Sequence, residues 1–522
     1  ELQTNKKPHL PKQNAKTYIL GIITISIAIT VLVAVFTINK LNIWLSILIG
    51  IVIFIPITEL ITGLTQIILS KFVKPTLIPK MDYAYGVPED KATMVIIPTI
   101  IESKEKVKDL LKKLEVFYLA NKSDNIYFTL LGDVTPSTKQ EEPYDNEIVQ
   151  QGKIEIENLN KKYPSKVMGK FQFIYRNRTW NPKEKSYLGW ERKRGMICLL
   201  NKFLCEKTIG LFKINTMEEE QNIPKIKYII TLDADTNLVL NSGLELIGAA
   251  AHILNKPELN TENNAVTLGH ALIQPRVGID LISARKSLFT KIYAGAGGVD
   301  SYTNAISDTY QDNFNEGIFT GKGIYDLEVF HTIFKNQIPD NTVLSHDLLE
   351  GSYLRCGLSS DILLLDGYPY KYNAYILRLS RWIRGDWQII GWLKKKIITK
   401  EEIKIENPLG LLSKFKILDN LRRSLVEIMV MISLGILTLK LILNIKVWPL
   451  VIALLAIVIL PTILETICYI FNKEVSNAKH KYFVKTISSI KASLLRGILD
   501  IGFLPHKAYI SLNAIIKTIY II

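Results

Sequence analysis

YIITLDAD, at residues 228–235, is an apolar run of strand type that ends in two carboxylates, Asp233 and Asp235. Side chains two positions apart in an extended segment point the same way, so both carboxylates can face one cation at the end of a buried strand. Carboxylate oxygens suit Mg²⁺ or Mn²⁺, and these ions also bind a diphosphate. An ordinary acidic turn after a strand has the same pattern, so the interpretation depends on the rest of the chain.

Apolar residues make up 48% of the 522 residues, a high fraction for a soluble protein of this length. The excess lies in four runs of nearly continuous Ile, Leu and Val, each long enough to cross a hydrocarbon core of about 30 Å. These runs cover residues 18–38, 43–68, 424–443 and 448–471. We therefore predict an integral membrane protein. Because Glu1 stands in place of Met and Ile522 ends an apolar stretch, we expect a piece of a longer chain.

The domain organisation follows from these runs. We predict a cytoplasmic N-terminal segment over 1–16 and two transmembrane helices within 17–71. A globular insert covers 72–423 and ends in interfacial helices, because residues 408–421 mix apolar and basic side chains around Phe415. Two more transmembrane helices lie within 424–471, and 472–522 forms cytoplasmic, interfacial or further membrane helices.

Basic residues predict the orientation in the membrane. Clusters of lysine precede the first apolar run and follow the last, while the connectors between paired runs carry little charge: Lys6, Lys7, Lys12 and Lys16 before, and Lys473, Lys479, Lys481 and Lys485 after. The positive-inside tendency then puts both ends and the insert in the cytoplasm of a multi-pass plasma (inner) membrane protein. The net charge of +15 fits membrane lipids and a phosphate-bearing substrate, and no arginine-rich tract indicates nucleic acid. The four cysteines lack metal-ligand spacing.

Strand and helix patterns alternate through the insert. Residues 94–98, 126–131 and 171–175 predict short buried strands, and 104–119 predicts an amphipathic helix. The alternation favours a parallel α/β sheet with ligands at the carboxyl ends of its strands. The polar stretch 132–152 predicts a mobile loop.

The residues at these strand ends resemble the GT-A fold of inverting family-2-type glycosyltransferases. Pro98 is followed by Glu102, the second strand ends in Gly132 and Asp133, and ERKRGMICLLN at 191–201 precedes the D-x-D triplet. The resemblance implies that Asp235 carries the metal and that the nucleotide sugar contacts Thr99, Glu102, Asp133, Lys193 and Asp233. Taken singly, Glu102 and Asp133 could equally be a helix N-cap and a turn carboxylate.

The second half of the insert supplies residues for an acceptor. LSHDLLEG, at 344–351, resembles the T-E-D segment of these enzymes, which implies Asp347 as general base and Glu350 as its catalytic neighbour on the acceptor. Inverting transfer needs one carboxylate to take the proton of the attacking hydroxyl while a metal steadies the leaving diphosphate. A helix N-terminal position is the alternative role of Asp347.

RLSRWIRGDWQ, at 378–388, resembles the Q-x-x-R-W motif of processive synthases, with Arg378 where Gln is expected. The resemblance implies that Arg381 meets the diphosphate and that Trp382 and Trp387 bind the acceptor sugar. Trp and Arg are also common anchors at a membrane interface. GIFTGKG, at 317–323, lacks the spacing of a Walker loop, and we expect a turn at Gly321 that borders the acceptor site.

Five segments together resemble one narrower family, the glycosyltransferase portion of cyclic β-1,2-glucan synthases: GWERKRG at 189–195, GIFTGKGIYD at 317–326, SHDLLEG at 345–351, RWIRGDWQ at 381–388 and KILDNLRRSL at 416–425. The resemblance implies UDP-glucose as donor, a growing β-1,2-glucan as acceptor and further domains of the same polypeptide. Another membrane polysaccharide synthase, of cellulose or hyaluronan type, and a lipid-phosphate glycosyltransferase are alternatives. A nucleotide-binding membrane scaffold is a third, which the intact Asp233, Asp235 and Asp347 disfavour.

Two further hypotheses concern residues outside the transfer site. The family resemblance raises Tyr163, Tyr175 and Tyr187 as possible sites of self-glucosylation, although most such tyrosines are packing residues. Three predicted spans each contain one carboxylate, at Glu59, Glu427 and Glu465, which could border a polar path for the glucan. Pairing of Glu427 and Glu465 with Arg422 or Arg423 at the interface is the alternative.

Overall fold

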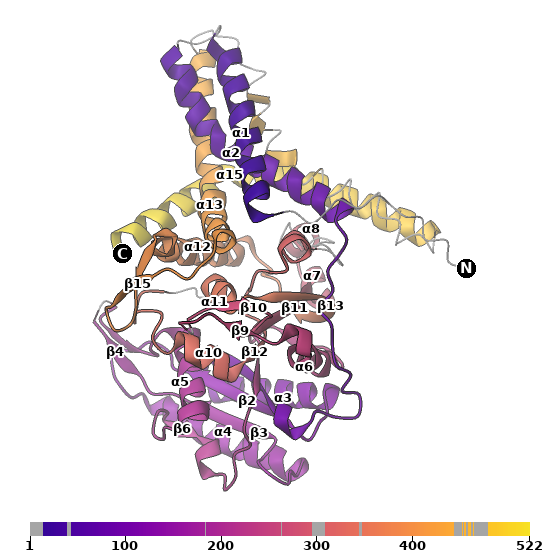
Figure 1. The fold of residues 1–522 in the computed structure, drawn as a ribbon, viewed down its shortest axis with the longest axis vertical. Coiled ribbons are helices and arrows are strands. Elements are labelled where there is room, and N and C mark those ends of the chain that lie inside the picture. Colours follow the sequence, from indigo (N-terminus) through magenta and orange to yellow (C-terminus); the bar gives the residue numbers. More distant parts are fainter. Residues whose placement is uncertain are drawn as a thin grey trace.

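The computed structural model describes residues 14–38, 43–182, 184–262, 264–294, 308–343, 347–442 and 479–521, with several positions between 451 and 463. A mixed α/β sheet domain forms one end of the molecule, and a bundle of long helices projects from it (Figure 1). Most of the predicted span 448–471 lies outside the described residues.

The sheet has nine strands in the order β6-β3-β2-β1-β7-β12-β11-β13-β8. In chain order they are β1 (Thr93–Ile100), β2 (Ile126–Asp133), β3 (Phe171–Tyr175), β6 (Ile214–Asn215), β7 (Tyr228–Thr231), β8 (Asn237–Leu238), β11 (Leu272–Ile279), β12 (Gly323–Asp326) and β13 (Gly357–Asp366). The predicted strands 94–98, 126–131 and 171–175 are confirmed, and they pair in parallel as β1, β2 and β3.

The sheet is mixed, which corrects the expectation of a parallel sheet. β12 pairs antiparallel with both β7 and β11, and β6 and β8 are antiparallel at the two edges. Because β12 runs opposite to β7, its first residue, Gly323, lies opposite Thr231, where β7 ends. The turn before β12 is therefore brought to the strand ends, together with Asp133 of β2 and Asp366 of β13.

Two hydrophobic cores enclose the sheet, one on each face. Met94 and Ile96 of β1 belong to one core, and Val95 and Ile97 to the other, as the alternation of side chains along a strand requires. The first core is covered by α5 (Arg192–Glu206) and α10 (Leu327–Phe334), and the second by α3 (Lys104–Ala120), α4 (Pro143–Lys162) and α6 (Ser242–Ala251). The predicted helix 104–119 is thus confirmed as α3. Ser103 caps it by accepting from the backbone N–H of Lys106.

The stretch 132–152 is only partly a loop, because α4 begins at Pro143. A capping box between Glu142 and Asp145 caps the N-terminus of this helix. The remaining elements outside the bundle are short, except for α12 with 17 residues. They are β4 (Thr179–Asn181), β5 (Ser186–Leu188), β9 (Glu258–Leu259), β10 (Val266–Leu268), α7 (Leu281–Arg285), α8 (Leu288–Tyr293), α9 (Thr309–Phe314), α11 (Asp347–Tyr353), α12 (Tyr372–Gln388), β14 (Lys396–Ile398) and β15 (Lys404–Glu406), with 3-10 turns at Glu89–Lys91, Thr216–Glu219, Ile253–Asn255 and Ile389–Leu393.

The bundle contains α1 (Ala15–Ile38), α2 (Ile43–Phe72) and α13 (Leu411–Ile442), and α15 (Lys479–Ile521) crosses its lower end (Figure 1). Among the described residues, two helices are long and apolar enough to cross a membrane, Ala15–Val35 within α1 and the whole of α2. They coincide with the first two predicted spans. Residues 408–421 and 424–443 were expected to form an interfacial helix and a separate span, but α13 runs through both ranges without a break.

Candidate active site at the strand ends

Four charged side chains meet where β7 ends, β12 begins and β13 ends. Asp233 follows β7, and its Oδ1 lies 2.6 Å from Lys193 Nζ of α5. Lys322, in the turn before β12, lies 3.1 Å from Asp233 Oδ2 and 2.6 Å from Asp366 Oδ2. Thr236 donates to the other oxygen of Asp366 at 2.5 Å. The site therefore combines two carboxylates with two lysines in one connected network.

The charges in this network stabilise one another. Burial acts to raise the pKa of Asp233, but Lys193 and Lys322 outweigh it and hold that pKa well below the usual range of an aspartate. Burial likewise disfavours the charged form of Lys322, yet Asp233 and Asp366 keep its pKa above the ordinary value of a lysine. Both lysines are thus cations at neutral pH, positioned where a substrate phosphate can replace Asp233 as their partner.

Asp235 lies two residues further on and is exposed. Its pKa is raised above the ordinary value, by the protein packed around it and by the nearby carboxylates of Asp366 and Asp233. A divalent cation would relieve this repulsion, so the donor set fits the predicted metal at Asp235. No group of three or more His, Cys, Asp or Glu converges among the described residues. Mg²⁺ does not need such a group, since it is often held by one or two carboxylates plus substrate phosphates.

Asp347 comes to the same site from the other half of the domain. It is the first residue of α11, and its carboxylate packs against Gly321, where an added Cβ would lie 3.0 Å from Asp347 Oδ2. Gly321 has φ of 86°, a conformation that favours glycine, and its carbonyl accepts from Lys193 at 2.8 Å. The D-x-D triplet and the DLLEG segment therefore converge through Gly321 and Lys193. Residues 344–346 lie outside the described residues.

Glu350 is buried on α11. Leu349, the residue before it on α11, belongs to the first core. The structure therefore positions Glu350 deeper than Asp347. Its role on the acceptor stays a prediction.

The residues predicted to contact uridine line the ends of β1 and β2. Thr99 is half-buried and Glu102 is exposed at the end of β1. Asp133 is fully buried, and its Oδ1 accepts from Arg176 Nε at 2.5 Å. Asp133 Oδ2 is also buried and has no hydrogen-bond partner among the described residues. Arg176 in turn donates to the carbonyls of Trp190 and Arg192, so it ties β2 to the start of α5.

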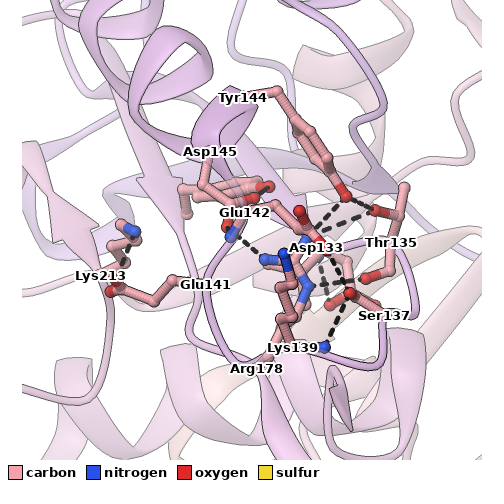
Figure 2. Close-up of polar contacts among 12 residues, drawn as sticks. Asp133, Thr135, Ser137, Lys139, Glu141, Glu142, Tyr144, Asp145, Arg178 and Lys213 are labelled. Atoms are coloured by element: carbon pink, nitrogen blue, oxygen red, sulfur yellow. Dashed lines mark hydrogen bonds and ion pairs between the residues drawn. The ribbon is translucent and has the colours of Figure 1, made fainter. Parts of the chain in front are cut away.

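A polar network beside Asp133 holds the loop that follows β2 (Figure 2). Arg178 pairs with Asp145, donates to the Thr135 carbonyl at 2.8 Å and donates to Tyr144 Oη at 3.0 Å. Tyr144 and Thr135 share a further hydrogen bond of 2.7 Å. Arg178 therefore satisfies polar groups of this loop that water would otherwise bind, and it holds the loop in place after the end of β2.

The R-W segment lies on α12, between the sheet domain and the bundle (Figure 1). Arg381 and Trp382 are exposed, and Arg378 covers the Trp382 ring with its guanidinium 4.6 Å from the ring centre. Arg378 therefore makes a cation–π contact at the position where the related synthases have Gln. Trp387 points elsewhere, because its indole nitrogen donates to Ser424 Oγ of α13 at 3.0 Å. Whether these residues bind an acceptor stays a prediction.

Sequence reasoning missed Lys322, Asp366 and Arg176. DILLLDG, at 361–367, is an apolar strand that ends in Asp, the same pattern as YIITLDAD, and it could have identified Asp366. Lys322 stands between two glycines in GIFTGKG. The spacing of this segment excludes a Walker loop, and no other pattern in it indicates a phosphate-binding lysine. No sequence pattern comparable to these marks Arg176 as a residue of the site.

The tyrosines and the membrane carboxylates have defined surroundings where they are described. Tyr175 is buried and donates to Asp145, Tyr163 donates to Glu115 at 2.9 Å, and Tyr187 packs edge-on against Trp180. In the bundle, Glu59 pairs with Arg422 at 2.6 Å. The alternative to a polar path was that Glu427 and Glu465 pair with Arg422 or Arg423. In the structure it is Glu59 that pairs with Arg422. Glu465 lies outside the described residues.

A mixed α/β domain with carboxylates and lysines at its strand ends, joined to two apolar N-terminal helices, fits a glycosyltransferase associated with a membrane. No family model matches the sequence. Over 475 residues the chain is 34% identical to the cyclic β-(1,2)-glucan synthase NdvB of Rhizobium meliloti (strain 1021). The chain is therefore related to the cyclic glucan synthases, which confirms the resemblance of its motifs. The match covers 89% of this chain but only 16% of NdvB.

Proposed function

We propose that this chain carries the transfer step of a glucan synthase. It moves glucose from UDP-glucose to a hydroxyl of a growing β-1,2-glucan, with inversion at the anomeric carbon and without releasing the chain between transfers. The observation that carries the proposal is the convergence of Asp233 and Asp347 through Lys193 and Gly321. Similarity to a cyclic β-(1,2)-glucan synthase supports the choice of sugar and linkage.

The residues of the site divide between donor and acceptor. Thr99, Glu102 and Asp133 hold the uridine, and the unpaired Asp133 Oδ2 accepts one donor group of the base. Lys193 and Lys322 receive the diphosphate and stabilise the charge that develops as it leaves. A Mg²⁺ or Mn²⁺ held by Asp235 would supply further neutralisation of the diphosphate.

On the acceptor side, Asp347 takes the proton of the attacking hydroxyl. Its carboxylate packs against Gly321, whose carbonyl accepts from Lys193, so the base lies close to a lysine that meets the diphosphate. Glu350, Arg381, Trp382 and Trp387 orient the acceptor and the diphosphate. The sheet domain works in the cytosol, and the helices hold it at the inner membrane, where the remaining domains of the polypeptide process the glucan.

UDP release by the full chain in detergent tests the proposal. The assay compares a panel of UDP-sugars with and without EDTA, and sets Asp347→Asn beside Asp109→Asn, an exposed aspartate on α3. Loss of a general base costs about 10²-fold or more in rate. We expect release from UDP-glucose alone, its loss with EDTA and with Asp347→Asn, and its retention in Asp109→Asn.

Other outcomes identify the alternatives. Turnover with a different sugar, or a product linkage other than β-1,2, would assign the site to another membrane polysaccharide synthase. Binding of UDP without turnover of any sugar would favour the nucleotide-binding scaffold. Unchanged turnover in Asp347→Asn would remove Asp347 as the base.

A further inference from the structure

The last helix, α15, exposes an apolar face along its length. From residue 491 onward, where its side chains are described, the exposed large apolar residues form two groups on one side of the helix, within 494–498 and 509–520, and the exposed residues between the groups are Gly502, Pro505 and His506. The exposed large apolar residues are Leu494, Leu495, Ile498, Tyr509, Leu512, Ile516, Ile519 and Tyr520. At 1.5 Å per residue this face is about 39 Å long. A surface helix in water would instead place polar residues on its exposed side.

The buried face of α15, which packs against α12 and α13, is apolar as well. It combines small or hydroxyl-bearing residues with two large apolar ones: Leu504, Ala508, Ser511, Ala514, Ile515 and Thr518. A helix with large apolar residues on its exposed side as well as its buried side is typical of contact with lipid. The exposed face therefore requires an apolar environment that the described residues do not provide.

Charge and position indicate which environment this is. Residues 479–521 contain seven Lys and Arg but one acidic residue, Asp500. Asp500 is already engaged, because Lys507 lies 2.7 Å away and Tyr293 donates to it at 3.2 Å. The exposed Lys491 and Lys517 flank the apolar face. Figure 1 shows α15, in yellow, running across the lower end of the bundle and transverse to α1.

We propose that α15 lies in the surface of a bilayer with anionic headgroups. Its apolar face enters the boundary between headgroups and acyl chains, and its lysines bind the lipid phosphates. A second copy of this chain is a poorer occupant, because two such helices would bring their basic residues together. The excess of positive charge in α15 thus selects an anionic lipid surface.

This placement has a consequence for the sheet domain. α15 packs on α12, which carries Arg381 and Trp382, and Tyr372 of α12 stacks on Phe503 with ring centres 4.0 Å apart. Tyr372 Oη also lies 3.0 Å from His506 Nδ1. Lipid that binds the outer face of α15 would therefore hold α15 in place, and α15 in turn supports α12.

Collision of a nitroxide spin label with oxygen or with a water-soluble nickel chelate tests the proposal. The full chain, with its native cysteines replaced by alanine, is labelled at Ile516→Cys or Leu494→Cys and reconstituted in phosphatidylcholine vesicles with or without phosphatidylglycerol. Ile209→Cys is the matched control, since Ile209 is exposed on the sheet domain between α5 and β6.

We expect labels at 516 and 494 to lose access to nickel and gain access to oxygen in the phosphatidylglycerol vesicles, while the label at 209 stays open to nickel. Lys491→Gln with Lys517→Gln should reduce that protection. Nickel access at all three positions would overturn the proposal. Dipolar broadening that disappears on dilution with unlabelled protein would assign the face to a second copy, and equal protection without phosphatidylglycerol would remove the role of anionic headgroups.

Discussion

Lys322 is the residue on which the charge balance of the site depends. Its side chain is 6% exposed and pairs with Asp366, which is 3% exposed, and with Asp233. Replacing Lys322 by Met leaves the Asp366 carboxylate buried without its cation, and breaking a buried pair in this way costs about 3–5 kcal/mol. We therefore expect a clear drop in the apparent melting temperature of the detergent-solubilised protein.

The double variant Lys322→Met/Asp366→Asn is the control for this prediction. It removes the unpaired charge, and the amide oxygen of the introduced asparagine can still accept from Thr236, so most of the lost stability should return. Equal melting temperatures for the wild type and the single variant would contradict the buried pair.

His270 predicts a dependence of stability on pH. It is 5% exposed, its Nδ1 lies 2.8 Å from the carbonyl oxygen of Arg355, and burial lowers its pKa from 6.5 to about 4. The folded protein thus resists protonation that the unfolded chain accepts. Stability from this residue is complete above pH 6.5 and is lost as the pH falls toward 4, by up to about 3 kcal/mol.

Melting temperatures of the wild type and of His270→Gln, measured from pH 7.5 to 4.5, check this expectation. The variant starts lower, because Gln fits the imidazole site poorly against Gly357. Its further decrease with pH should be smaller than that of the wild type. Parallel decreases in the two proteins would show that other groups cause the acid sensitivity.

At the residue scale, a site residue could be predicted from the sequence only where its partners lie close to it along the chain. Asp233 and Asp235 were predicted because the rule of alternating side chains acts within one strand. Lys322 and Asp366 were missed because the three residues that meet here are far apart in the sequence: Lys322 lies 89 residues from Asp233 and 44 residues from Asp366, its two partners. They meet only because β12 inserts antiparallel between β7 and β11, which is a property of the sheet order rather than of any local segment.

At the scale of elements, hydrogen bonds join α12 to α13: Asn420 donates to Asp386 at 2.9 Å, and a second bond links Trp387 to Ser424. Trp387 Nε1 donates to Ser424 Oγ, which is 7% exposed as a residue and itself donates to the Leu421 carbonyl. Ser424→Ala leaves the indole N–H without this acceptor and should cost about 1–3 kcal/mol. The check is a double-mutant cycle on the melting temperature with Trp387→Phe, which removes the donor.

If the bond stabilises the contact, Ser424→Ala should cost less in the Trp387→Phe background than in the wild type. Additive losses would mean that Trp387 contributes by packing alone. This role in the α12–α13 contact does not depend on the predicted acceptor role of Trp387.

The same helix shows why element boundaries near the bundle were not predicted. The charges of KILDNLRR, at 416–423, suggested a break before the next apolar run. In the structure Arg422 pairs with Asp419 one turn earlier and with Glu59 of α2, so the charges are satisfied inside the bundle and α13 continues. A polar segment can therefore remain helical at this depth when another helix supplies its partner.

At the scale of the whole molecule, the exposed apolar surface of the bundle predicts how the protein partitions. α1 leaves Leu20, Leu32 and Val35 more than half exposed, and an exposed face of this kind is stable in lipid rather than in water. We therefore expect the full chain, expressed in bacteria, to sediment with membranes. High salt should not release it, because salt screens charge but does not weaken apolar burial.

Extraction with alkaline carbonate distinguishes insertion from surface binding. The inserted chain should stay in the pellet, whereas Ile27→Arg, near the middle of α1, should raise the extracted fraction because Arg at the centre of a span costs about 2.5–3.5 kcal/mol. Ile209→Arg, on the sheet domain, is the matched control and should leave partitioning unchanged. If carbonate released the wild type, α1 and α2 would be packed against protein instead of lipid, and the membrane surface proposed for α15 would have no bilayer beside it.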